Sequence, residues 1–181
     1  MQSDIGKSLF GAGTVKRIII YGLMTLVLGC AQCAFFPILK ICPSTPDLIM
    51  GMLLAIALWD SERSAAVVAV CAGFFIDAIG SSGLALSPII YLLFVLLISF
   101  FSKKVLKSFM SYLLLLIPTL LYRGAATYIC IMAHQRALPP LWVLSDIILP
   151  EALATGLLCL PIYLIVKLCS GILETHSRFT F

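Results

Sequence analysis

The stretch GFFIDAIGSSGLALSPIIY, residues 73–91, decides the fold because it holds the end of one apolar segment, a turn and the start of the next. Gly80 and Gly83 supply the backbone freedom that a tight turn needs, and a serine followed by Pro88 is typical of a helix start. The pattern predicts two apolar helices joined by a short turn, with the carboxylate of Asp77 near the end of the first.

The composition of the whole chain indicates an integral membrane protein. Of its 181 residues, 62% are hydrophobic and only 11% are charged, too few to cover the surface of a soluble domain. The net charge of +4 comes from basic residues that lie between apolar runs, which favours a topological role over nucleic acid binding. We expect one polytopic domain over residues 1–181. The first apolar run, residues 18–36, is longer than a typical signal-peptide core, so we expect a retained span.

The lengths of the apolar runs predict an all-α bundle of six transmembrane helices. A helix needs about 20 apolar residues to cross roughly 30 Å of hydrocarbon. The second run is only about two-thirds of a crossing at a rise of about 1.5 Å per residue, which indicates either a helix buried among its neighbours or a locally thin bilayer. The expected spans are residues 17–39, 47–59, 64–79, 88–101, 108–133 and 146–172.

The positions of Lys and Arg predict the orientation of these spans. With the amino terminus in the cytoplasm, only Lys40 and Arg136 fall on the outer side, as the positive-inside rule requires. Both termini are then cytoplasmic. The basic residues on the cytoplasmic side are Lys7, Lys16, Arg17, Arg63, Lys103, Lys104, Lys107, Lys167 and Arg178.

Asp77, Arg123 and Glu151 fall inside the expected spans. Ionisable residues at this depth are costly and are functional candidates. At about 1.5 Å per residue, Asp77 and Arg123 lie about 20 and 22 Å above the inner face, and Glu151 lies about 7 Å below the outer end of its span. We hypothesise that Arg123 is the counter-ion of Asp77, of Glu151 or of both. The alternative is that the two carboxylates reach water separately while Arg123 extends toward the outer surface.

The sequence lacks the residue patterns of a typical enzyme. Its histidines, His134 and His176, are expected on opposite sides of the membrane, and metal-binding and phosphate-loop motifs are absent. We expect no catalytic activity, no cofactor and no metal. Cys30 and Cys33 form a C-x-x-C pair, but they lie within a span, where cysteines that pack as small hydrophobes are favoured over a redox pair.

Three stretches of the chain share their order and pattern with a known family: TPDLIMGMLLAIAL (residues 45–58), GFFIDAIGSSGLALSPIIYLL (residues 73–93) and ILPEALATGLLCLPIYLI (residues 148–165). They resemble the MreD family of bacterial rod shape-determining membrane proteins. They add Asp47, Gly73 and Pro150 to the candidate residues. The family often has an asparagine near the place of Ala154 or Thr155, and neither residue is one here, so Glu151 is expected to be a local substitute for that polar group.

This resemblance implies a six-helix bundle similar to the substrate-binding subunits of energy-coupling-factor vitamin transporters. It implies a non-catalytic scaffold in the bacterial cytoplasmic membrane that supports lateral peptidoglycan synthesis and rod shape. The implied partners are MreC, a RodA-type glycosyltransferase, a class B penicillin-binding transpeptidase and the MreB filament. The surrounding membrane lipid is a further partner, and nucleic acid is not.

Small residues could form contacts with the helices of partner proteins, because helices in lipid associate through close van der Waals packing. For Gly51, Ala55, Ala65, Ala66 and Ala69 we favour packing within the chain's own bundle over contacts with a partner. The lysines at 103, 104 and 107 are already explained by topology, although an acidic partner or anionic lipid is a second possible role.

The alternative function is that of the vitamin-binding transporter subunit itself, because a shared fold gives a shared hydropathy pattern. Such a subunit is expected to place polar and aromatic side chains around an outer pocket. The loop near residues 134–145 offers His134, Arg136 and Trp142 for that purpose, whereas the loop at 80–87 offers few such side chains.

Overall fold

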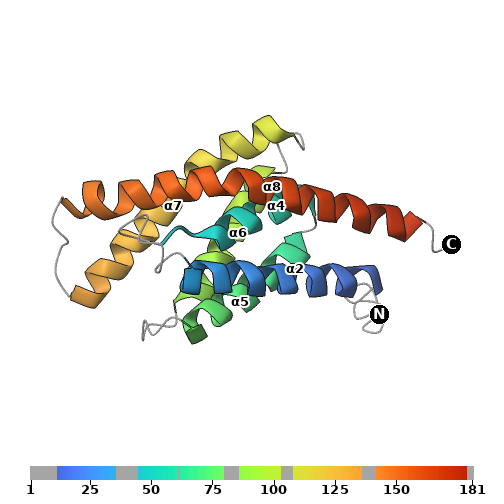
Figure 1. Ribbon diagram of the computed structural model, residues 1–181, viewed down its shortest axis with the longest axis horizontal. Coiled ribbons are helices and arrows are strands. Elements are labelled where there is room, and N and C mark those ends of the chain that lie inside the picture. Colours follow the sequence, from blue (N-terminus) through green and yellow to red (C-terminus); the bar gives the residue numbers. More distant parts are fainter. Residues whose placement is uncertain are drawn as a thin grey trace.

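The computed structural model describes residues 12–35, 45–60, 62–79, 86–102, 108–135 and 142–178. This part of the chain contains six helices and no strand (Figure 1), so the expected all-α fold is confirmed. The helices are α2 (Ala12–Cys30), continued by the π-helical segment η1 (Ala31–Phe35); α4 (Leu48–Trp59); α5 (Glu62–Ile79); α6 (Ser87–Ser102); α7 (Phe109–Gln135); and α8 (Leu149–Arg178), which the π-helical segment η2 (Leu144–Ile148) precedes.

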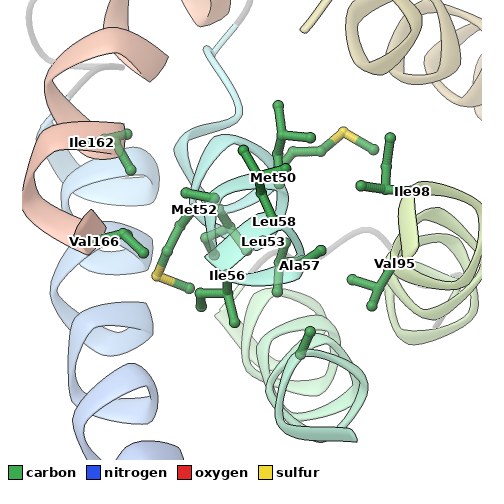
Figure 2. Close-up of a cluster of buried hydrophobic side chains, with 14 of the residues drawn as sticks. Met50, Met52, Leu53, Ile56, Ala57, Leu58, Val95, Ile98, Ile162 and Val166 are labelled. Carbon is green, nitrogen blue, oxygen red and sulfur yellow. The ribbon is translucent and has the colours of Figure 1, made fainter. Parts of the chain in front are cut away.

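The short helix α4 is the centre of the molecule. All of its residues from Leu48 to Leu58 are buried, and it packs against α2, α5, α6, α7 and α8. Figure 2 shows its side chains between Ile162 and Val166 of α8 on one side and Val95 and Ile98 of α6 on the other. With 12 residues, α4 is only about 18 Å long at 1.5 Å per residue. Because protein surrounds it, this helix does not need to match the thickness of a bilayer.

The helices around α4 are apolar on their outer faces as well. Large apolar side chains are exposed along α2, α5, α6, α7 and α8, including Leu157 at 71% and Leu121 at 71%. Such an extended apolar surface is unfavourable in water and is typical of contact with lipid. Three helical segments, Thr14–Ala34, Phe109–Ala133 and Leu144–Gly171, are long and apolar enough to cross a membrane. The fold therefore indicates a helical membrane protein.

Each of the six expected spans overlaps one observed helix. The agreement is closest for α4, expected over residues 47–59 and observed at Leu48–Trp59. The shorter apolar helices α4 and α6 do not reach the length of a spanning helix, and α5 carries three charged residues, Glu62, Arg63 and Asp77. Six crossings with cytoplasmic termini therefore stay a prediction. The first turns of α2 and the last turns of α8 lie at the same end of the molecule (Figure 1), which is compatible with it.

Glycines allow the closest helix contacts in the bundle. A Cβ at Gly73 would meet the backbone of Pro88, so this glycine lets α5 approach the start of α6. A Cβ at Gly51 would meet the side chain of Cys159, so α4 and α8 are in similarly close contact. Ala55, Ala65 and Ala69 are fully buried and Ala66 is partly buried, and all four belong to the core or pack against it. These small residues pack within the chain's own bundle, as the sequence favoured.

Candidate functional site

Arg123 of α7 bridges two buried carboxylates. Its Nε lies 2.9 Å from Oε1 of Glu151, and its Nη1 lies 3.2 Å from Oδ2 of Asp47. The carboxylate side chains are almost inaccessible, at 3% for Glu151 and 0% for Asp47, and the arginine side chain is 24% exposed. The planar guanidinium suits this arrangement because its donors diverge and reach two acceptors at once.

The Asp47 side chain receives further hydrogen bonds from two other places in the chain. Its Oδ1 accepts the backbone N–H of Met50 at 3.1 Å, so Asp47 caps the first turn of α4. A carboxylate is favourable there because it satisfies a free N–H and faces the positive end of the helix dipole. The hydroxyl of Tyr91, on α6, donates to Oδ2 of the same carboxylate at 3.0 Å. Asp47 therefore joins α4 to α6 as well as to α7.

The backbone at the start of α4 is also held by side chains from other helices. The N–H of Asp47 donates to Oγ1 of Thr155 at 3.0 Å, and the N–H of Leu48 donates to Oε1 of Gln32 at 3.1 Å. The first N–H groups of a helix lack partners within it, and a buried one without any partner is costly. Thr155 of α8 and Gln32 of η1 supply the missing acceptors. We call Asp47, Arg123, Glu151, Tyr91, Thr155 and Gln32 the Asp47 cluster.

The Asp47 cluster confirms one part of the pairing hypothesis and corrects another. Arg123 and Glu151 form the expected ion pair. Asp77 is not the second partner, because its Oδ2 instead accepts the backbone N–H of Ser87, at 3.2 Å, at the start of α6. The other oxygen of Asp77 is buried without a hydrogen-bond partner among the described residues. The second partner is Asp47, which the resemblance had marked as a candidate but which the depth comparison had left out.

A simple signal in the sequence points to Asp47. This residue is the first of the second expected span, and in the expected topology its carboxylate enters the bundle from the same side as Glu151. The depth comparison covered only charges well inside the spans. A helix-capping carboxylate at the start of a short, buried helix also lies deep in the protein, because that helix starts within the bundle and not at its surface.

The remaining sequence candidates have separate positions. Gly73 is buried at the contact between α5 and α6, and Pro150 is partly buried in the first turn of α8. Gly80 and Gly83 lie outside the described residues. Thr155, one of the two positions near which an asparagine was expected from the resemblance, is 1% exposed and accepts the hydrogen bond from the Asp47 backbone, so it provides a polar contact from α8.

A second ion pair lies at the opposite end of α4. Nη1 of Arg17, on α2, is 2.7 Å from Oδ1 of Asp60, the residue that follows α4. No group of three metal-binding side chains occurs within the described ranges. Cys30 is exposed, Cys33 is half-buried, and both are free thiols.

The Asp47 cluster is thus an electrostatic crosslink between helices of a membrane protein. Breaking a buried ion pair by removing one partner typically costs about 3–5 kcal/mol, because a buried charge is left without compensation. Comparison of the chain with protein-family models, with curated proteins and with solved structures finds no match. The class that the fold and the site define is a helical membrane protein whose central helix is held by buried charges.

Proposed function

We propose that this chain is a non-catalytic scaffold of the complex that synthesises peptidoglycan during cell elongation. In this proposal it is a multi-pass protein of the bacterial cytoplasmic membrane, with six crossings, cytoplasmic termini and the bundle architecture of energy-coupling-factor substrate-binding subunits. Its partners are MreC, a RodA-type glycosyltransferase, a class B penicillin-binding transpeptidase and the MreB filament. The basis for the family is the resemblance of three separate stretches to MreD.

The observation that carries the proposal is that all three stretches meet at the Asp47 cluster. The first stretch supplies Asp47, the second supplies Tyr91, and the third supplies Glu151 and Thr155. Segments far apart in the sequence thus share one buried contact. Residues that resemble a family for a common structural reason are expected to converge in this way.

The chemistry of the cluster suits a structural role. Arg123 neutralises charge on Asp47 and Glu151, and Tyr91 donates to the same carboxylate as Met50. These contacts fix α4, α6, α7 and α8 relative to one another. A scaffold needs this property, because a partner helix in lipid recognises a surface whose shape and spacing stay constant.

Purification of the tagged full-length chain from its source bacterium in a mild detergent tests the proposal. We expect MreC and the two synthases to be recovered with the wild-type chain. Arg123→Met should reduce this recovery because the helices lose their common contact. Asp77→Asn is the matched control, since it also removes a charge but lies outside the cluster, and it should retain the partners.

Two results would contradict the scaffold role. Recovery of an ATPase module or of a bound vitamin with the wild-type chain would instead support the transporter-subunit function. Recovery of neither set of partners, from membranes in which MreC and the synthases are intact, would also contradict it.

A further inference from the structure

A lysine lies over two aromatic rings at the end of α4 that is far from the Asp47 cluster. Nζ of Lys167, on α8, lies 5.4 Å from the centre of the Trp59 ring and 6.0 Å from the centre of the Tyr163 ring. Trp59 ends α4, and Tyr163 is one helical turn before Lys167, a spacing that brings side chains together. An ammonium within about 6 Å of an aromatic face is attracted to it. We call Trp59, Tyr163 and Lys167 the lysine platform.

The rings under the lysine are held by the protein core. Tyr163 is 1% exposed, and its ring centre lies 4.5 Å from that of Tyr112 and 5.4 Å from that of Phe109. The Trp59 ring centre lies 6.3 Å from that of Tyr163. The packed rings therefore restrict the position of the Lys167 ammonium, whereas the ammonium of most surface lysines moves freely.

The charge of Lys167 is not neutralised within the part of the chain that the structure describes. Its side chain is exposed, and no described carboxylate lies within ion-pair distance of it. The carboxylate that follows Trp59 in the chain belongs to Asp60, which pairs with Arg17 at 2.7 Å and is 2% exposed. The lysine platform thus presents a positioned cation that is available to an anion from outside the protein.

The position of the platform along α8 places it near the membrane surface. Lys167 lies near the last residue of the apolar stretch, Gly171, and follows Asp146, near the first residue, by 21 residues. This separation is about 31 Å of helix, close to the thickness of the hydrocarbon layer. Beside Lys167, Leu164 and Leu168 are exposed at 55% and 68%. A cation next to exposed leucines at this depth is complementary to a phospholipid, because the phosphate can contact the cation while the adjoining acyl chains contact the leucines.

We propose that the lysine platform binds the phosphate of an anionic phospholipid, with the acyl chains along Leu164 and Leu168. The site goes beyond the scaffold role and depends only on the chain being a membrane protein. Any lysine at the membrane surface also attracts anionic lipid without a specific site. Lipid binding at the lysine platform differs because it requires the aromatic rings as well as the lysine, so substitution of a ring should weaken it.

The test measures phosphatidylglycerol binding to the full chain in phosphatidylcholine nanodiscs, with native mass spectrometry as the readout. Lys167→Gln should weaken binding about fivefold, since one basic residue at the surface contributes about 1 kcal/mol. Lys167→Arg keeps the cation and should bind within about twofold of wild type. Trp59→Leu keeps the lysine but removes one ring, and should weaken binding about threefold, the scale of an exposed cation–π contact.

Lys16→Gln is the matched control, because Lys16 is an exposed lysine of α2 at the end of the bundle assigned to the cytoplasm. It should change binding less than Lys167→Gln does. Equal effects of the two lysine substitutions, or no effect of Lys167→Gln, would overturn the proposal, and this comparison does not depend on whether the Trp59 variant folds. Inorganic phosphate added to discs of pure phosphatidylcholine should not bind. If it binds and Lys167→Gln abolishes the binding, the site takes soluble phosphate and the lipid assignment is wrong.

Discussion

The two ends of α4 hold their charges in different ways. At its start, Asp47 is fully buried and is contacted by Arg123 and Tyr91 from two other helices. At its end, Asp60 pairs with Arg17, and the neighbouring Lys167 lies exposed over aromatic rings. The first arrangement uses its charges to join helices, whereas the second leaves a cation facing outward. The charges at the start of α4 join several helices, whereas Lys167 at its end faces outward, so substitutions at the two ends should differ in the size of their effect.

The largest loss of stability is expected for Arg123→Met, at the start of α4. This change leaves Asp47 and Glu151 in the bundle without their cation, and removal of one partner of a buried ion pair costs about 3–5 kcal/mol. Reversible unfolding in mixed detergent micelles measures the loss. A loss below about 1 kcal/mol, the range of exposed pairs, would show that the cluster does not hold the bundle.

A smaller loss is expected for Tyr91→Phe, which removes the hydroxyl that donates to Asp47 but keeps the ring. Hydrogen bonds to charged groups contribute about 1.5–3 kcal/mol. The same unfolding measurement applies, and Tyr122→Phe is the control, because the Tyr122 hydroxyl donates to the uncharged backbone oxygen of Ile90 at 2.8 Å. If Tyr122→Phe lost more stability than Tyr91→Phe, the hydrogen bond from Tyr91 to Asp47 would not be the more important of the two.

At the other end of α4, Arg17→Gln removes the ion pair of Asp60, whose side chain is almost inaccessible at 2%. We expect a loss of about 1–3 kcal/mol, the cost of removing the partner of a buried polar group, because one carboxylate is affected where Arg123→Met affects two. The same unfolding measurement applies. A loss as large as that of Arg123→Met would contradict the difference between the two ends.

The smallest effect is expected for Asp77→Asn. The asparagine side chain keeps a carbonyl oxygen that can accept the hydrogen bond from the backbone N–H of Ser87, so only the charge is lost. We expect a change below about 1 kcal/mol, the net value of a typical hydrogen bond. A loss of stability as large as that of Arg123→Met would instead support Asp77 as a partner of Arg123, as the sequence first suggested.

The apolar runs of the sequence were sufficient to predict the helices, because helix length and hydropathy are local properties of the chain. The pairing of charges was predicted only in part. Glu151 was matched to Arg123 by depth, but Asp47 was not, since the depth of a residue at the start of a short helix depends on where the other helices place that start. The lysine platform was not predicted, because Trp59 and Lys167 are far apart in the sequence and meet only through packing.

Double-mutant cycles on Arg123 test the central claim most directly. The free energy of unfolding is measured for Arg123→Met, for Asp47→Asn and for the double variant, and then in the same way with Asp77→Asn. Residues in one ionic network show coupling energies of about 0.5–3 kcal/mol, whereas independent sites add within about 0.5 kcal/mol. We predict strong coupling of Arg123 to Asp47 and none to Asp77. Coupling to Asp77 without coupling to Asp47 would contradict the account.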